Sequence, residues 1–237
     1  MSYLIFRGVS TASLTGVQVA KMPDHKKASM RRTEYRVKGR DGVLNVDEGF
    51  DNFQLTVTLV LIDAPAGTRQ LVNAWADGTG KLVSSDDPTK AYKASVKEEI
   101  VWKRVRGNTG YFDTAKITFD CEPFMYEATD SQVVVTADLA NWVNPGSADA
   151  YPLIKVEGTD TYAVCFYFCD EYIILYGMDP NDPVFIDCEN GYVYTQSGTA
   201  RSMVGNIPKI PIGTNSIAFN MEHPPTKLTI TPHWRWV

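Results

Sequence analysis

The chain carries few side chains that could act as a catalytic base. Its histidines are His25, which lies among charged residues, His223, which precedes two prolines, and His233, which lies in an aromatic segment. A serine hydrolase needs a histidine beside its nucleophile, and the sequence contains neither a G-x-S-x-G elbow nor an H-E-x-x-H zinc motif. The sequence therefore gives no support to a histidine-based active site.

Paired carboxylates are the other candidate chemistry, because two acids can act as general acid and general base in a glycosidase. Adjacent acids occur at Asp86-Asp87, Glu98-Glu99 and Asp170-Glu171. Neighbouring residues on a strand point to opposite faces, and adjacent acids at turns are common on protein surfaces. We expect a protein that is not an enzyme and has no catalytic residue. Of the three functions that we consider in this section, a two-carboxylate glycosidase ranks last.

Cysteines could bind a metal or form a disulfide. The four are Cys121, Cys165, Cys169 and Cys188, and no pair has the C-x2-C spacing of a zinc site. On one strand, Cys165 and Cys169 would stand about 13 Å apart at ~3.3 Å per residue, beyond the reach of a disulfide. We expect four buried free thiols, made in a reducing cytoplasm, and neither a metal site nor a cofactor.

The strongest charge feature is a basic stretch from Lys21 to Arg40, which holds eight Lys and Arg against two acids. Nucleic-acid binding is one interpretation. Against it, the whole chain is acidic, with a pI of about 5.2, and Tyr35 is the aromatic residue of the stretch. Residues 37–43 instead resemble a hairpin turn, with glycines where a positive φ is needed. We favour a projecting basic hairpin that docks on a neighbouring chain.

An acidic surface for this hairpin could come from two places in a neighbouring copy. Asp47, Glu48 and Asp51 follow the hairpin turn directly. The second half of the chain is also acidic: residues 128–237 hold 5 Lys and Arg against 12 Asp and Glu, whereas residues 1–127 hold 18 against 16. Opposite charges on two surfaces of one chain favour association of copies.

The same charge shift predicts a domain boundary. Together with the polar break at residues 130–132, it divides the 237 residues into domains 1–130 and 131–237, each large enough for its own core. No apolar run approaches the roughly 18–20 residues of a membrane span, and the apolar stretch before Arg7 is too short for a signal peptide. We expect the protein to stay where it is made, unless it leaves within a particle.

Short segments with period-two alternation dominate the sequence. Residues 54–61 read Q-L-T-V-T-L-V-L, which places Leu55, Val57 and Leu59 on one face of a strand. Further β-branched or aromatic runs bounded by turn formers lie at residues 115–119, 133–135, 153–156, 164–168, 192–194 and 227–231. This pattern predicts an all-β fold of two β-sandwich domains, the first with a projecting hairpin.

One short helix interrupts the strands. Thr68 is expected to cap it, Leu71, Val72 and Trp75 would form its apolar stripe, and Asp77-Gly78 would end it. It is long enough to lie across one sheet of the first domain. In the second domain, residues 140–150 are rich in turn formers and are expected to form a loop.

Short motifs follow one another in a fixed order along nearly the whole chain. They are F-R-G-V at Phe6, the pair Arg31-Arg32, G-R-D-G at Gly39, G-K-L at Gly80, D-D-P at Asp86, A-Y-K-A at Ala91, C-E-P-F at Cys121, Y-P-L-I-K-V at Tyr151, I-D at Ile186, G-N-I-P at Gly205, G-T-N at Gly213 and T-P-H-W-R at Thr231. Each motif is weak alone. Their order and spacing resemble the distal tail protein family of long-tailed phages, the ring proteins of siphophage baseplates and tail-tip hubs, especially in phages of Gram-positive hosts.

The resemblance implies a structural protein of a phage tail tip. Six copies would form a hexameric ring through the N-terminal sandwich, joining the tail tube protein to the tail-associated hub protein. The C-terminal sandwich would be galectin-like and lie outside the ring, which carries receptor-binding or other baseplate proteins for host attachment. The implied location is the virion, after assembly in the cytoplasm of the host bacterium, without direct nucleic-acid recognition or membrane insertion.

Applied to this sequence, the resemblance makes the basic hairpin and the helix candidates for ring formation. The oligomer-interface candidates are Arg31, Arg32, Lys38, Arg40, Asp47, Glu48, Leu71 and Trp75. The alternative function is a carbohydrate-binding module that recognises host-surface saccharide through the C-terminal sandwich. Trp142, Trp234 and Trp236 could stack on a sugar ring there, although tryptophans in sandwiches are more often core or interface residues.

Overall fold

The computed structural model describes residues 2–24, 26–107 and 110–237, so the expectation for His25 lies outside the described residues. The chain divides into two compact units, Met1–Ala128 together with Val237 (unit 1) and Thr129–Trp236 (unit 2). In the described residues the structure is all-β apart from one α-helix and the 3-10 helix Thr11–Ser13. No helix in these residues is long and apolar enough to cross a membrane.

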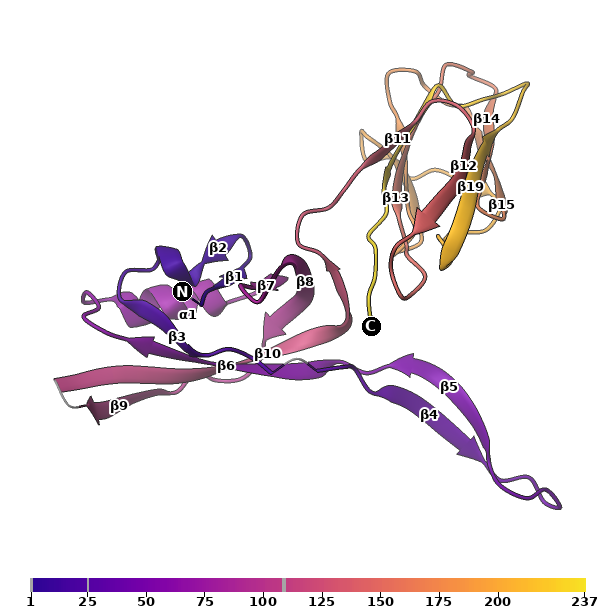
Figure 1. The fold of residues 1–237 in the computed structure, drawn as a ribbon. Coiled ribbons are helices and arrows are strands. Elements are labelled where there is room, and N and C mark those ends of the chain that lie inside the picture. Colours follow the sequence, from indigo (N-terminus) through magenta and orange to yellow (C-terminus); the bar gives the residue numbers. More distant parts are fainter. Residues whose placement is uncertain (1, 25, 108–109) are drawn as a thin grey trace. The chain divides into compact units, whose positions relative to one another are not determined.

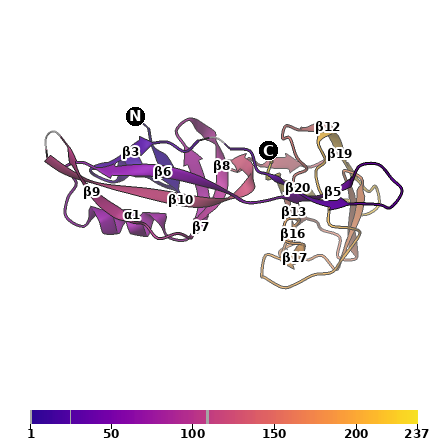
Figure 2. The ribbon, with the colours of Figure 1, turned by 90° about the horizontal axis from the view of Figure 1, so that it is seen from below.

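Eight strands in the described part of unit 1 form one antiparallel sheet, in the order β2-β1-β7-β8-β10-β6-β3 with β9 on the side of β10. They are β1 (Leu4–Phe6), β2 (Val9–Ser10), β3 (Val17–Lys21), β6 (Phe53–Leu61), β7 (Thr79–Ser84), β8 (Asp87–Val96), β9 (Trp102–Gly107) and β10 (Gly110–Glu127). Strand β10, with 18 residues, pairs with other strands along both of its edges. It pairs with β6 along one edge and with β9 and then β8 along the other (Figure 2).

The sheet of unit 1 folds over a single core. In a flat sheet β1 and β10 would lie three strand spacings apart, about 14 Å at ~4.8 Å per spacing. Instead, the rings of Phe6 in β1 and Phe119 in β10 meet edge to face at 5.2 Å. Leu55, Val57 and Leu59 of β6 are buried in the same core, which confirms the alternation of residues 54–61. The predicted first sandwich is therefore built from one continuous, folded sheet.

Helix α1 (Thr68–Ala76) packs against this core. Its buried residues are Thr68, Val72, Trp75 and Ala76. They share one face at the helical spacing of i, i+4 and i+7, and this spacing leaves Leu71 on the solvent side with 58% of its surface exposed. The expected stripe is therefore wrong at Leu71. The N-cap is Gly67 rather than Thr68, whose hydroxyl donates to the carbonyl of Pro65 instead.

Strands β4 (Met30–Tyr35) and β5 (Leu44–Phe50) form a two-stranded sheet of their own. Figure 1 shows this hairpin continuing from β3 and β6 beyond the larger sheet of unit 1. Gly39 and Gly42 in its turn have φ of +85° and +79°, as the sequence predicted for a turn at residues 37–43. At its base, the ring of Phe50 packs edge to face on Phe124 of β10 at 5.6 Å.

Unit 2 is a sandwich of two antiparallel sheets, each with five strands in the described residues. One sheet contains, in spatial order, β11 (Val133–Val135), β20 (Lys227–Thr231), β13 (Leu153–Glu157), β16 (Val184–Asp187) and β17 (Tyr192–Thr195). The other contains β12 (Leu139–Asn144), β19 (Gly213–Phe219), β14 (Ala163–Phe168), β15 (Glu171–Tyr176) and β18 (Met203–Val204). Residues from both sheets share one core, in which Phe166, Ile154 and Ile230 are fully buried.

The expected loop at residues 140–150 is partly wrong, because β12 extends through Asn144. The pairing of β12 with β19 shifts register between Leu139 and Trp142, and Asn141 there has φ of +59°. Such a bulge accommodates an extra residue in a strand, and asparagine tolerates the left-handed conformation that it needs. The turn-forming composition of this segment therefore concealed an irregular strand.

The four cysteines are free thiols, with Cys121, Cys165 and Cys188 buried as expected. Cys169 is half-buried and lies just after β14, with φ of +53°, so it does not share a strand with Cys165. Burial raises the pKa of the thiols of Cys121, Cys169 and Cys188 to about 12. Among the described residues, no group of three or more His, Cys, Asp or Glu could hold a metal ion.

Candidate assembly surfaces

The β4–β5 hairpin is amphipathic. Its register pairs Tyr35 with Leu44 and Thr33 with Val46, so these four side chains share one face, while the residues between them point the other way. Tyr35, Leu44 and Val46 are each between 41% and 52% exposed. An apolar face on a two-stranded sheet with no third strand is marginal in water unless it meets a partner.

Ion pairs across the hairpin satisfy the acids that follow its turn. The Nε of Arg32 lies 2.7 Å from Oδ1 of Asp47, and the guanidinium of Arg31 lies 3.3 Å from Asp51 and 3.8 Å from Glu48. We expected these acids to provide a complementary surface for a neighbouring copy. Within one copy these acids pair with arginines of their own hairpin, and their contact with a neighbouring copy stays a prediction.

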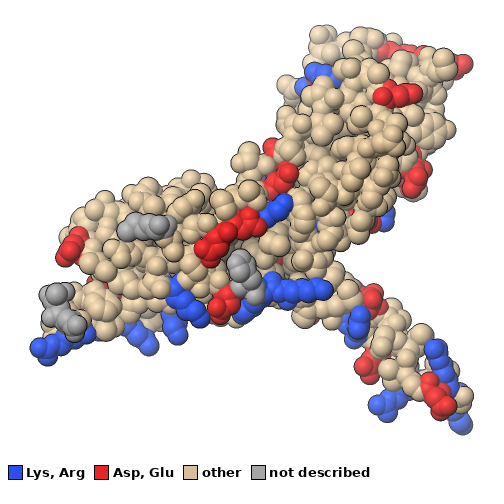
Figure 3. Space-filling model, in the orientation of Figure 1, with Lys and Arg blue, Asp and Glu red and all other residues tan. Residues whose placement is uncertain are grey.

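The tip of the hairpin keeps its positive charge. Arg36, Lys38 and Arg40 are exposed there beside a single acid, Asp41, and none of the four forms an ion pair with another described residue. Figure 3 shows basic side chains gathered toward this tip. Of the predicted interface residues, Lys38 and Arg40 are therefore the ones whose charge is available to a partner.

The two interface candidates on α1 differ. Trp75 is buried, and its indole N–H donates to the carbonyl of Val9 over 2.8 Å. Its ring also meets Phe6 and Phe119 edge to face, so Trp75 belongs mainly to the core, although it is 6% exposed. Leu71 and an edge of Trp75 both line a shallow surface hollow beside Arg7, but Leu71 is 58% exposed. We retain Leu71 and not Trp75 as a surface residue that a partner could contact.

A salt-bridge cluster anchors α1 to the β9–β10 hairpin. Arg69 of α1 binds Asp113 of β10 with a nitrogen–oxygen distance of 2.6 Å, and Arg104 of β9 approaches the same carboxylate at 3.4 Å. The hydrogen bond from Arg69 holds the pKa of Asp113 below its usual range. Because this cluster joins residues 44 positions apart, no local motif could have revealed it.

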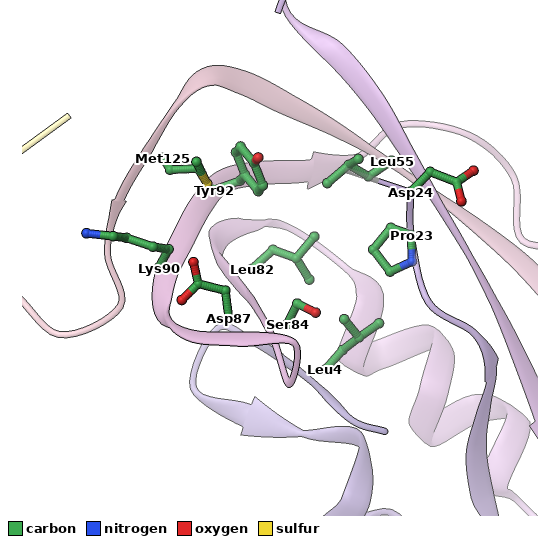
Figure 4. Close-up of a pocket in the computed structure, with 10 residues that line it drawn as sticks. All are labelled: Leu4, Pro23, Asp24, Leu55, Leu82, Ser84, Asp87, Lys90, Tyr92 and Met125. Carbon is green, nitrogen blue, oxygen red and sulfur yellow. The ribbon is translucent and has the colours of Figure 1, made fainter. Parts of the chain in front are cut away.

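A small apolar pocket lies in unit 1 and was not foreseen from the sequence. Its cavity volume is about 120 Å³, and its apolar lining comes from β1, β6, β7, β8 and β10. Figure 4 shows the lining side chains, which are Leu4, Pro23, Asp24, Leu55, Leu82, Ser84, Asp87, Lys90, Tyr92 and Met125. Alternation in sequence predicts that such residues face a core, but it cannot show that they leave part of the core open.

The tryptophans of unit 2 do not form an exposed platform. The rings of Trp142 and Trp234 lie 5.4 Å apart, and Trp142 also packs edge to face on Phe168. The indole of Trp236 donates to the carbonyl of Pro145 over 3.2 Å. All three belong to or border the core of the sandwich, in line with the more common role of tryptophan in such folds.

Tyrosines, which the sequence analysis did not single out, cover the outer face of the β14–β15 pair instead. Tyr167 and Tyr172 are cross-strand neighbours with ring centroids 4.6 Å apart. Tyr176 lies on the same face, and its ring meets that of Tyr162 at 6.2 Å. Tyr162, Tyr167 and Tyr176 are all exposed. Their spacing on two strands that meet through a turn could have suggested this surface.

The described histidines bind loops together. Nδ1 of His223 lies 2.6 Å from Oδ2 of Asp160, a contact that holds the pKa of this carboxyl below its usual range. Asp160 also accepts the backbone N–H groups of Tyr162 and Ala163. Nδ1 of His233 contacts the carbonyl oxygen of Tyr151 at 3.1 Å. The two histidine contacts each connect segments that are distant in sequence, 63 and 82 residues apart.

Comparisons with known proteins identify this architecture. No family model matches the sequence, and no curated protein does. Among solved structures, the chain is similar to the Dit protein of phage SPP1, described as a paradigm of the hub adsorption apparatus in phages that infect Gram-positive bacteria. The TM-score is 0.73, with 15% identity over 100% of both chains.

Two structures of the baseplate of phage P2 in its activated conformation are also similar. The one with Ca has a TM-score of 0.56, 11% identity and coverage of 97% of this chain and 96% of the other. The one with Sr has a TM-score of 0.55, 10% identity and 97% coverage of both chains. The resemblance noted in the sequence is thus matched in three dimensions, and the chain has the fold of SPP1 Dit and of these phage baseplate chains.

Proposed function

We propose that this chain is a non-enzymatic structural protein of a phage tail tip. The observation that carries the proposal is the likeness to SPP1 Dit over the full length of both chains, at a TM-score of 0.73. A likeness confined to one sandwich would be weak support, since sandwiches serve many functions. Here the likeness covers both units.

In this proposal six copies form a ring through unit 1, and the ring joins the tail tube protein to the tail-associated hub protein. A ring needs two unlike, complementary surfaces on each copy. The apolar face and basic tip of the β4–β5 hairpin supply one such surface, and the solvent side of α1 around Leu71 is a separate candidate surface. Receptor-binding or other baseplate proteins would attach to the assembled ring, in the virion, after assembly in the host cytoplasm.

Mass photometry tests the ring. The purified chain is measured alone and after mixing with the proposed hub partner. We expect a species at six times 26.4 kDa in the first sample, or at that mass plus the mass of the bound hub protein in the second. A chain that stays at its monomer mass in both samples, over a range of salt concentrations, would overturn the proposed ring.

A second function, recognition of host-surface saccharide by unit 2, is supported by the exposed tyrosines Tyr162, Tyr167 and Tyr176. Aromatic faces stack on sugar rings, and Asn220, which donates to the hydroxyl of Tyr172 over 3.1 Å, adds a polar group beside them. The test is binding of the chain to purified host cell-wall saccharide. Tyr167→Ala should weaken that binding, whereas Tyr111→Ala, a change at an exposed tyrosine of unit 1, should not.

A further inference from the structure

We propose that the apolar pocket of unit 1 receives the tip of the β4–β5 hairpin from a second copy, with Val37 entering the pocket. This inference rests on the proposed ring and names the contact that would join one copy to the next. Arg36 and Lys38, which flank Val37, would meet the acids Asp24 and Asp87 at the rim of the pocket.

The pocket is suited to one aliphatic side chain. Its walls are mainly Leu4, Leu55, Leu82, Tyr92 and Met125. An apolar cavity of about 150 Å³ can hold a benzene molecule, so a cavity of about 120 Å³ has room for the isopropyl group of a valine. Val37 is 52% exposed in its own copy and has no core to enter there.

The charges around the pocket complement those around Val37. Figure 4 shows Asp24 and Asp87 on opposite sides of the pocket, with the ammonium of Lys90 directed away from it. Lys21 lies 3.4 Å from Asp24, but both side chains are largely exposed, so this pair is weak and a partner's cation can replace it. Val37, between two cations, thus faces an apolar pocket whose lining carries two acids and one lysine, Lys90, which also interacts with Asp87.

The hairpin cannot place Val37 in the pocket of its own copy. From Met30 to Val37 there are seven residue steps, which span about 24 Å at ~3.4 Å per residue of an antiparallel strand. The pocket lies near the base of the hairpin, because its lining residues Asp24 and Leu55 are only a few residues before β4 and after β5. At this base the N–H of Asp51 donates to the carbonyl of Ser29. A Val37 side chain that enters the pocket must therefore come from a second copy.

A contact from the tip of one copy to the pocket of the next is heterologous. Each copy offers one tip and one pocket, so successive copies form a closed ring if the rotation between them closes. Apolar burial of Val37 would stabilise the contact, while the flanking charges would guide the tip toward the pocket and set its register.

Crosslinking between two differently marked copies tests the contact. One preparation carries Val37→Cys and the other carries Ser84→Cys, in the lining of the pocket. They are mixed, with and without the hub protein, treated with a short bismaleimide, and analysed by mass spectrometry and mass photometry. The matched control replaces the first preparation with Val101→Cys, a valine of unit 1 that is 53% exposed, and unsubstituted protein gives the background from native thiols.

We expect a link between positions 37 and 84 at least five times more abundant than the link between 101 and 84. Oligomers without this excess would overturn the pocket contact and leave the ring intact. A chain that stays monomeric, alone and with its hub protein, would overturn both. A link from position 84 to the hub protein in place of position 37 would assign the pocket to that protein and overturn the contact between copies.

A charge exchange provides an independent measurement on intact protein. Lys38→Glu and Asp24→Lys should each lower the oligomer fraction at low salt at least threefold, and combining them in one chain should restore it. Lys116→Glu, at an exposed lysine of β10, is the control and should leave the fraction unchanged. If the combined variant assembles no better than the single variants, Lys38 and Asp24 do not meet.

Discussion

The guanidinium of Arg32 and the carboxylate of Asp47 face each other across the β4–β5 hairpin, with 2.7 Å between Nε and Oδ1. The register of the two strands places them directly opposite, just beside the point where the pairing shifts at Arg31. A hairpin without a third strand is marginally stable, so cross-strand pairs of this kind help to keep it extended. Arg31 and Arg32 of the basic stretch thus form ion pairs within the hairpin, whereas the basic residues at its tip are available to a partner.

The first prediction concerns this pair. Arg32→Glu places two acids opposite each other and should loosen the hairpin while unit 1 stays folded, because both side chains are more than half exposed and an exposed pair contributes about 0.2–1 kcal/mol. Hydrogen exchange should show faster exchange of the amides of β4 and β5 only. Combining Arg32→Glu with Asp47→Arg should restore protection, and Lys38→Glu, at the tip, should not alter it. Unchanged exchange in Arg32→Glu would show that the pair is dispensable.

The second prediction separates the two helix residues that the sequence analysis placed together. Trp75→Ala should lower the free energy of unfolding by about 3–5 kcal/mol, because it removes a buried ring and leaves a cavity. Leu71→Ala should change it by less than about 0.5 kcal/mol, because that side chain is exposed. Urea denaturation of both variants measures the difference. Equal losses would mean that α1 packs differently from the structure described.

These two residues also show what the sequence could and could not reveal. A helix beginning near Thr68 could be predicted from the turn-forming residues before it and from the spacing of its apolar residues. Which of those residues face the core depends on the exact angle of each position around the axis, and Leu71 lies one step away from the buried row. The all-β class, the hairpin turn and the alternation of β6 were predictable because each depends on local periodicity.

The pocket and the ion pairs depend instead on contacts between distant segments. The lining of the pocket comes from five strands and the segment at Pro23, and the partner of Arg32 became evident only once the register of the hairpin was known. Two-residue periodicity fixes the face of a side chain but not its cross-strand partner. The sequence alone therefore did not show that Asp47 and Glu48 pair with arginines of their own hairpin.

The third prediction is that unit 2 folds without unit 1. Its core has residues from both of its own sheets, so removing residues 1–128 leaves that core complete. The fragment 129–237 should show β-type circular dichroism and a cooperative thermal transition. A fragment that is unfolded under conditions where the full chain is folded would contradict this division.

The fourth prediction concerns the cysteines. Since burial raises the pKa of the thiols of Cys121, Cys169 and Cys188 to about 12, these groups remain protonated at pH 8, and the thiolate is the reactive form. An aromatic disulfide reagent should therefore react slowly with the native protein and should titrate four thiols after denaturation without reductant. Rapid labelling of the native protein, with the site identified by mass spectrometry, would show which thiol is more accessible than described.

The last prediction uses the pH dependence of a charged cluster in unit 2. Glu157 lies 2.7 Å from Nζ of Lys155 and also binds Lys227, its cross-strand partner in β20. The hydrogen bond from Lys155, followed by that from Lys227, holds the pKa of Glu157 below its ordinary value. A carboxyl group with a lowered folded-state pKa stabilises the fold above its unfolded-state pKa, and this contribution is lost as the pH falls through the folded-state value.

Glu157→Gln should therefore lower the free energy of unfolding by about 0.5–1 kcal/mol at pH 7, a range that allows for the partial exposure of the three side chains. The difference from the unsubstituted protein should shrink steadily as the pH is lowered from 5 to 2. Urea denaturation at each pH measures it, with Glu222→Gln, at an exposed acid of the same unit, as the control. A loss that is the same at pH 7 and at pH 2 would mean that Glu157 acts through its shape and not through its charge.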